Sequence, residues 1–272
     1  MKVLVNGASA FVSTGGLAID TQQPTLVMLH GSGLNRTVWI LLARYFARRG
    51  FNVVAPDLPG HGASEGEPPQ TIEEQGVWVN NLLDVLAQEH GLPTAQMTVV
   101  GHSMGSLTAI ETTVGRLADV NRLILLGTSY PMAVGDALLA AAKANDYAAI
   151  DMISIFGHAN GSRLGANRVP GISALNMAMV LLEQAAPGVL HNDLAACQLY
   201  RGAEAAGDAM KESVQVSIIA GDQDKMTSMK GTVAVQQLFN AELHVLTSCG
   251  HMQMSEQPEQ TLQALKRILD VD

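Results

Sequence analysis

Short apolar runs alternate along the chain with segments of helical period. In segment 37–49 the apolar side chains share one face, which predicts a helix that ends at Gly50. Thr71 and Glu74 have the spacing of a capping box, which predicts the start of a helix that runs to Gly91. Because strands and helices alternate, the sequence predicts an α/β fold with a mostly parallel, doubly wound sheet. Six apolar runs are continuous, as in strands buried on both faces: 26–29, 52–55, 97–100, 122–126, 214–220 and 242–246.

Two parts of the chain depart from this rhythm. Segments 2–5 and 8–13 are separated by Asn-Gly, a dipeptide typical of tight hairpins, so we expect an antiparallel edge. Within residues 130–213 no run is typical of a strand, and Ala-, Leu- and Met-rich helical stretches are interrupted by Gly and Pro. We therefore predict a core of residues 1–129 and 214–272 that carries an inserted helical cap at 130–213.

Composition and charge narrow the class of protein. Apolar residues make up 47% of the 272 positions and charged ones 15%, which argues for a globular chain with a large interior. The 16 Lys and Arg against 25 Asp and Glu give 16 − 25 = −9, which argues against nucleic acid or an anionic membrane as partner. No apolar run reaches the roughly 18 residues of a spanning helix, and the first apolar segment is too short for a secretory signal. We expect a cytoplasmic protein without a membrane span; its oligomeric state stays open.

The sequence offers no metal or cofactor motif. Cys197 and Cys249 are too few for a disulfide framework, and no second pair completes a zinc site, so we expect both to be reduced and no metal to be bound. The first residues resemble the start of a dinucleotide-binding unit, but Ala10, Phe11 and Ser13 stand where the later glycines should be. We expect no nicotinamide and no other cofactor.

The strongest chemical signal is Gly-His-Ser-Met-Gly at residues 101–105, which follows the strand predicted at 97–100 and precedes a helical segment. In that context G-x-S-x-G is typical of a nucleophile elbow, where a tight turn holds Ser103 in strained geometry and small neighbours relieve the crowding. A serine that merely caps a helix is the alternative. A second match at 62–66 lies in a Gly/Pro-rich loop, so we interpret Ser64 as a loop residue.

A serine hydroxyl becomes a good nucleophile only when a base takes its proton, and the base needs an orienting acid. After an elbow the chain order is serine, acid, histidine. His251 follows the predicted strand 242–246, and Asp222 and Asp224 follow the strand 214–220, so both groups lie at strand ends where ligand sites of such sheets gather. His251 is therefore the predicted base, with either aspartate as the acid.

With these motifs in order, the chain resembles the α/β-hydrolase superfamily, and the resemblance covers nearly everything outside the predicted cap. It implies Asp224 as the acid, because the family motif is G-x-x-D, and it gives Asp57 and His61 no catalytic role. The matching segments are His-Gly-Ser-Gly at 30–33, Asp-Leu-Pro-Gly-His-Gly at 57–62, the motif at 101–105, Gly-Asp-Gln-Asp at 221–224 and Gly-His at 250–251.

The resemblance also implies an oxyanion hole, formed by the backbone N–H groups of Ser32 and Met104. Family members that act as dehalogenases or epoxide hydrolases have a carboxylate at the elbow, whereas this chain has Ser103, which argues against those reactions. Met132, Met152, Met177 and Met179 lie in the predicted cap, where they either form an adaptable apolar wall of the pocket or pack the cap onto the core.

The sequence therefore predicts a serine hydrolase that acts on small to medium apolar carboxylic esters through an acyl-enzyme. Lactone hydrolysis, cleavage of carbon–carbon bonds in vinylogous diketones, and acyl transfer to an acceptor other than water would use the same triad. An alternative of another class is a non-enzymatic receptor that retains the triad and binds a small apolar ligand. The expected partner is a small molecule in every case.

Overall fold

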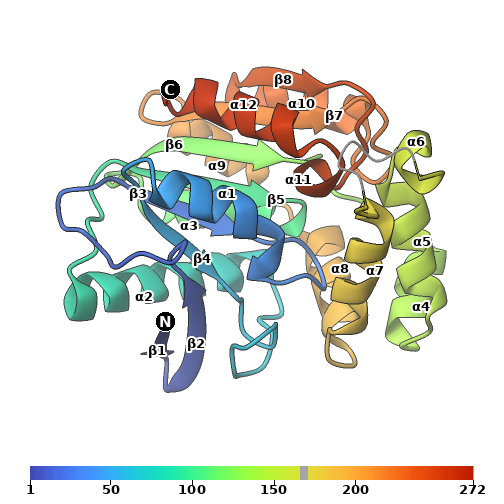
Figure 1. Cartoon of the computed structure of the whole chain (residues 1–272), viewed down its shortest axis with the longest axis horizontal. Helices are drawn as coiled ribbons and strands as arrows, with labels where there is room; N and C mark the ends of the chain where they lie inside the picture. The colour runs from blue at the N-terminus through green and yellow to red at the C-terminus, as the bar shows by residue number, and fades with distance from the viewer. Residues whose placement is uncertain (166–170, 272) are drawn as a thin grey trace.

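The computed structural model describes residues 1–165 and 171–271. Its strands form one sheet in the order β1-β2-β4-β3-β5-β6-β7-β8 (Figure 1). All six predicted strands are present, most of them a residue or two longer than their apolar runs. The expectation that all six are buried is wrong for segment 242–246, because β8 is an edge strand in which Leu246 alone is buried. The strands are β1 Lys2–Val5, β2 Ala8–Ser13, β3 Thr25–Leu29, β4 Asn52–Pro56, β5 Met97–His102, β6 Val120–Leu126, β7 Gln215–Gly221 and β8 Glu242–Leu246.

The sheet is parallel from β4 to β8 and antiparallel only at the edge formed by β1 and β2. The turn between these two strands contains Asn6 and Gly7, both with positive φ, as the predicted hairpin requires. The predicted fold class, a mostly parallel doubly wound α/β sheet, is confirmed. Because β3, β5, β7 and β8 all run in the same direction, the loops that follow them meet at one edge of the sheet.

Helices cover both faces of the sheet. The apolar faces of α2, α3, α9 and α10 pack on one side, and those of α1 and α12 on the other. The helices are η1 Arg36–Trp39, α1 Ile40–Ala47, α2 Ile72–His90, α3 Met104–Val114, α4 Asp136–Lys143, α5 Ala148–Gly157, α6 Asn160–Arg163, α7 Ala174–Glu183, α8 Val189–Leu199, α9 Ala203–Met210, α10 Met229–Phe239, α11 Gln253–Glu256 and α12 Pro258–Ile268.

Two predicted helices show how local sequence sets helix ends. At the start of α2 the capping box is complete, since the Glu74 N–H donates to Thr71 Oγ1 (3.1 Å) and the Thr71 N–H donates to the Glu74 carboxylate (3.3 Å). Gly91 ends this helix in the left-handed conformation. The helix predicted over 37–49 instead begins as the 3₁₀ turn η1, because the Asn35 side chain accepts a hydrogen bond from the Thr37 N–H (3.0 Å).

The helices α4, α5, α7 and α8 lie beyond the carboxyl ends of the strands, at the right of Figure 1. They share a small apolar core of their own, which also receives Leu34 and Met252 from loops that follow β3 and β8. Helix α9 contacts α3 and α10, so its apolar residues belong to the core on the sheet. In the described ranges no helix is both long and apolar enough to cross a bilayer. Both cysteines are free and buried.

Candidate active site

Ser103 lies between the end of β5 and the start of α3 in a strained backbone conformation, with φ 55° and ψ −122°. This conformation is rare for a residue with a side chain. A Cβ atom at Gly101 would overlap the carbonyl oxygen of Gly105, and one at Gly105 would overlap that of Leu29. The turn is therefore possible only with glycine on both sides, and it presents Ser103 at the carboxyl end of the sheet.

His251 and Asp224 face each other across the loops that follow β8 and β7. His251 Nδ1 lies 2.8 Å from Asp224 Oδ2. The other oxygen, Oδ1, accepts the N–H groups of Met226 (2.8 Å) and Thr227 (2.9 Å). Burial by itself would raise the pKa of Asp224, but the adjacent His251 and the hydrogen bonds from Thr227 outweigh it and lower the pKa. Asp224 is therefore a buried carboxylate aimed at an imidazole.

Asp222, the other acidic candidate, has a different position. Its Oδ1 accepts the backbone N–H of Cys249 (3.1 Å), which ties together the two loops that carry Asp224 and His251. The structure thus brings Asp224 to the histidine and uses Asp222 to hold the loops.

Two further residues, which sequence reasoning did not identify, fix this pair. Thr227 Oγ1 donates to Asp224 Oδ2 (2.6 Å) and lies 3.3 Å from His251 Nδ1. The buried carboxylate of Glu256 accepts the N–H groups of Gly250 (3.1 Å), Met252 (3.2 Å) and Ala159 (2.8 Å), and so fastens the histidine loop to the segment after α5. Thr227 could have been suspected from the sequence, because a threonine three positions after an aspartate is a weak signal for a turn. No local sequence signal marks Glu256.

The histidine next to Ser103 in the sequence is held neutral. His102 is fully buried, its Nε2 lies 2.9 Å from the carbonyl oxygen of His251, and its Nδ1 has no hydrogen-bond partner among the described residues. A second proton on Nδ1 would therefore be buried without an acceptor. Burial first, and then the neighbouring His251, lower the pKa of His102 to about 3.

The loop after β3 forms a tight turn opposite the elbow. The Leu34 N–H donates to the Gly31 carbonyl (3.1 Å), and His30 Nδ1 lies 3.0 Å from the same oxygen. The Gly31 carbonyl and the Ser32 N–H belong to one peptide plane and point in opposite directions. Since the carbonyl is held inside the turn, the Ser32 N–H points away from the turn, and within the described residues it has no hydrogen-bond partner.

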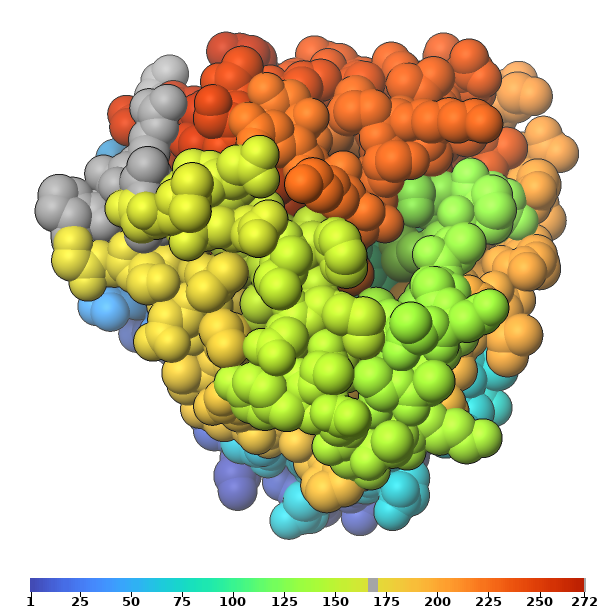
Figure 2. All heavy atoms as spheres, turned by 90° about the vertical axis from the view of Figure 1, so that its right-hand side faces the viewer, coloured from blue at the N-terminus to red at the C-terminus, as the bar shows by residue number. Residues whose placement is uncertain are grey.

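A cavity of about 260 Å³ joins these groups, since Ser32, Ser103 and His251 all line it. Figure 2 shows this face of the molecule hollowed where the green segment after β6 and the orange segment after β7 meet the helices between them. The remaining wall is mostly apolar and comes largely from residues 132–156, Leu194, Cys197 and residues 225–227. Met132 and Met152 are among its residues, whereas Met177 and Met179 are not.

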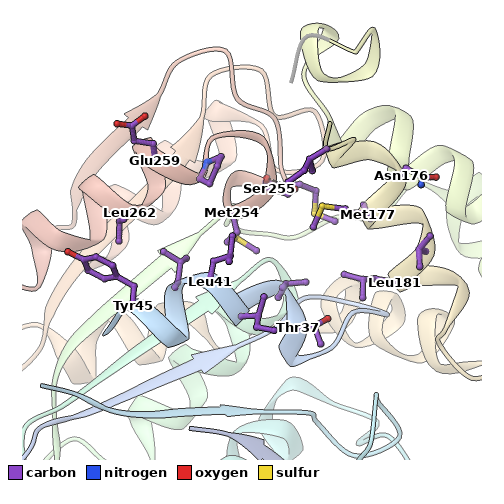
Figure 3. Close-up of a pocket in the computed structure, with 18 residues that line it drawn as sticks. Thr37, Leu41, Tyr45, Asn176, Met177, Leu181, Met254, Ser255, Glu259 and Leu262 are labelled. Atoms are coloured by element: carbon purple, nitrogen blue, oxygen red, sulfur yellow. Dashed lines mark hydrogen bonds between the residues drawn. The ribbon is translucent and has the colours of Figure 1, made fainter. Parts of the chain in front are cut away.

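A second cavity is larger, about 760 Å³, and lies between α1, α7 and α12 (Figure 3). Its lining is apolar as well and includes Met177, Met252 and the exposed Leu41. Neither Ser103 nor His251 lines it. The smaller cavity is therefore the candidate active site, because Ser103 and His251 line it.

The other residues singled out in the sequence have structural positions. Ser64 donates to the Asp57 carbonyl (2.7 Å) and accepts from the Phe11 N–H (2.8 Å), so its hydroxyl is used inside a loop. The Asp57 carboxylate pairs with Arg36. His61 lies 2.8 Å from Asp193 of α8. Within residues 1–165 and 171–271, no three His, Cys, Asp or Glu side chains cluster as a metal site would need.

Comparison with known proteins agrees with this architecture. Residues 26–264 match the model of the alpha/beta hydrolase family. The chain is 31% identical over 252 residues to pimeloyl-(acyl-carrier protein) methyl ester esterase of Aromatoleum aromaticum, covering 87% of this chain and 94% of that protein. It is 26% identical over 256 residues to 3-oxoadipate enol-lactonase 2 of Acinetobacter baylyi, covering 92% and 90%.

Among solved structures, the enol-lactonase of Burkholderia xenovorans LB400 superposes with a TM-score of 0.82 at 18% identity, covering 99% of this chain and 100% of that one. At that identity the likeness concerns the fold. The family match covers most of the chain, and curated relatives over nearly its full length are hydrolases. The chain is therefore a hydrolase and belongs to the alpha/beta hydrolase family.

Proposed function

We propose that this protein is a serine hydrolase that cleaves carboxylic esters through an acyl-enzyme. The observation that carries the proposal is the buried hydrogen bond between Asp224 and His251, 2.8 Å long, beside a cavity that both His251 and the strained Ser103 line. Acyl transfer requires a nucleophile, a base and an orienting acid, and this arrangement supports these roles for Ser103, His251 and Asp224.

In the proposed reaction Ser103 Oγ attacks the ester carbonyl carbon while its proton passes to His251 Nε2. Asp224 accepts the Nδ1–H of the same ring and so orients it and stabilises its positive charge. His251 then gives the proton to the departing alkoxide, which leaves an acyl group on Ser103. Water, deprotonated by His251, attacks the carbonyl carbon of this acyl-enzyme. The bond from that carbon to Ser103 Oγ then breaks, His251 returns the proton to Oγ, and the acid is released.

Negative charge develops on the former carbonyl oxygen, and we propose that the N–H groups of Ser32 and Met104 receive it. The Ser32 N–H is supported by the turn geometry, which leaves this donor without an internal partner and beside the cavity. The Met104 N–H belongs to the first residue of α3, where helix N–H groups have no partner within the helix. Donors fixed before the reaction stabilise the transition state without reorganisation.

The substrate class follows from the cavity and the relatives. The lining is apolar and the volume, about 260 Å³, suits small to medium acyl groups. Relatives named as a methyl ester esterase and an enol-lactonase support cleavage of an acyl–oxygen bond. We further propose that, within residues 130–213, the helices α4, α5, α7 and α8 act as a cap, because α4, α5 and α8 supply much of the wall of this cavity, whereas α9 packs on the sheet.

The test combines a fluorophosphonate probe with a panel of aryl esters, alkyl esters and lactones. Wild type should be labelled at Ser103 and turn over the esters, and Ser103→Ala should lose labelling and about a millionfold in kcat. Ser64→Ala removes the serine of the other G-x-S-x-G match and should keep both. Labelling without turnover of any ester or lactone would contradict the proposal and favour a ligand-binding receptor.

A further inference from the structure

A buried carboxylate of α8 holds the turn that carries the proposed oxyanion donor. Asp193 is fully buried, its Oδ2 accepts the Gly33 N–H (2.8 Å), and the same oxygen lies 2.8 Å from His61 Nε2. Nothing in the sequence connects these residues, since Asp193 and His61 are 132 positions apart. The other oxygen, Oδ1, has no hydrogen-bond partner in the part of the chain that the structure describes.

His61 and Asp193 form a buried ion pair. His61 Nδ1 lies 3.0 Å from the Pro59 carbonyl and its Nε2 faces Asp193, so both ring nitrogens meet acceptors, an environment that favours the protonated ring. Burial alone would lower the pKa of His61, but the Asp193 carboxylate outweighs it, with help from the Pro59 carbonyl and the charge of Asp57, and raises the pKa. Burying two charges is costly, and well-packed apolar residues of similar size often serve stability as well.

The geometry of the turn shows what the pair holds. Residues 31–34 form a four-residue turn closed by the hydrogen bond from Leu34 to Gly31, and Gly33 at its third position has φ +65°, as a type II turn requires. The N–H that Asp193 accepts belongs to the central peptide of this turn, between Ser32 and Gly33. The peptide just before it carries the Ser32 N–H. Fixing the central peptide therefore limits rotation of the proposed donor.

Other contacts of α8 reach the same turn. Ser32 Oγ lies 3.8 Å from Cys197 Sγ, and a Cβ atom at Gly33 would stand 2.9 Å from Leu190 Cδ1. Helix α8 thus packs directly on the turn, with the charged contact at its centre.

We infer that Asp193 is a positioning residue of the oxyanion hole: its carboxylate, held by His61, fixes the turn 31–34 so that the Ser32 N–H faces the cavity. The inference rests on the proposed function, because the oxyanion role of Ser32 belongs to it. It also means that a helix of the predicted cap, rather than the sheet alone, sets the geometry in which the transition state is stabilised.

The test separates positioning from stability. In Asp193→Leu/His61→Phe both charges are replaced by apolar side chains, so the protein should fold, but the Gly33 N–H loses its acceptor. We expect kcat to fall about 100-fold with KM within a few-fold, because displaced oxyanion donors act mainly in the transition state. Asp193→Asn still offers a carbonyl oxygen to Gly33 and should keep kcat within about tenfold of wild type.

A second readout is affinity for a trifluoromethyl ketone, which forms a tetrahedral adduct with the serine and mimics the transition state. Its affinity should fall in parallel with kcat in the double variant. The control is Tyr200→Phe, which removes the hydrogen bond from the residue after α8 to Glu111 (2.6 Å), a contact that does not involve the turn, and should leave kcat unchanged.

Each outcome either supports the inference or contradicts it. The inference is wrong, and Asp193 has only a structural role, if the stably folded double variant has the kcat of wild type. The same holds if Tyr200→Phe lowers kcat as much as the double variant does. If wild type itself shows neither labelling at Ser103 nor turnover, the proposed function fails and the inference falls with it. Loss of kcat and of ketone affinity in the double variant, with partial retention in Asp193→Asn, supports the inference.

Discussion

Two fully buried histidines should make the protein unstable in mild acid. In His30, Nδ1 faces the Gly31 carbonyl and Nε2 accepts the Leu58 N–H (3.1 Å). A second proton would have to bind at Nε2, which would break the hydrogen bond from Leu58. His102 Nδ1 is buried without a partner. Burial first, and then the charge of His61 for His30 and of His251 for His102, lower the pKa of each ring to about 3. Both rings therefore stay neutral in mild acid while the fold is intact.

The size of the effect follows from linkage. The pKa values of both rings in the folded protein lie below the ordinary histidine value of about 6.5, so the unfolded chain binds these two protons first as the pH falls. Their contribution to stability is complete above about pH 6.5 and is lost as the pH falls toward 3. Each histidine contributes a slope of about 1.4 kcal/mol per pH unit, so the two together remove roughly 3 kcal/mol for each pH unit, from a total stability of about 5–15 kcal/mol.

The free energy of unfolding can be measured by urea titration at several pH values between about 7 and 4.5, followed by tryptophan fluorescence. Trp39 is fully buried and Trp78 nearly so, which makes both suitable reporters. His102→Gln can still donate to the His251 carbonyl but does not titrate, so the slope should fall by about 1.4 kcal/mol per pH unit. His90→Gln, at the exposed end of α2, is the matched control and should leave the slope unchanged.

The reasoning is refuted if stability is flat between about pH 6.5 and 4.5, or if His102→Gln retains the full wild-type slope. It is refuted as well if His90→Gln changes the slope as much as His102→Gln, because an exposed side chain lies in water in both states.

The remaining predictions concern the other charges, the acid and the pocket. Because the pKa of His61 is raised, its stabilising effect is complete below about pH 6.5 and is lost as the pH rises through the folded-state value; Asp193→Asn should flatten this part of a thermal-unfolding profile. Asp224→Asn should lower kcat by about 10⁴-fold, whereas Asp222→Asn, which alters only a loop contact, should mainly lower Tm. Since the cavity wall is apolar, kcat/KM should rise from acetyl to butyryl esters, with each buried methylene stabilising the transition state by up to about 0.8 kcal/mol. Met152 lines this cavity, so Met152→Ala should shift the optimum to longer acyl chains. An acyl-chain profile that is the same in wild type and variant would contradict this. Incubation with EDTA should leave ester turnover unchanged, and loss of activity would contradict the proposed mechanism.

The sequence by itself determined the elements and their order. Continuous apolar runs predicted the strands that pair in parallel, Thr71 and Glu74 predicted the start of α2, and Asn6-Gly7 predicted the hairpin. The strained turn at Ser103 was predictable too, because Gly101 and Gly105 are the glycines that its geometry demands. Each of these features depends on residues within a few positions of one another, so the local pattern contains the information.

Tertiary structure decided which side chains meet. The positions of Asp222 and Asp224 after one strand left both as possible acids, and the family resemblance favoured Asp224; the packing of two loops brings Asp224 to His251. Tertiary structure also decided which of the two apolar cavities Ser103 and His251 line. The pair of His61 and Asp193 had no local signal at all, because 132 residues separate its members. Hydrogen bonds and ion pairs depend on distances of a few tenths of an ångström, and between remote segments these are fixed only when the whole core packs.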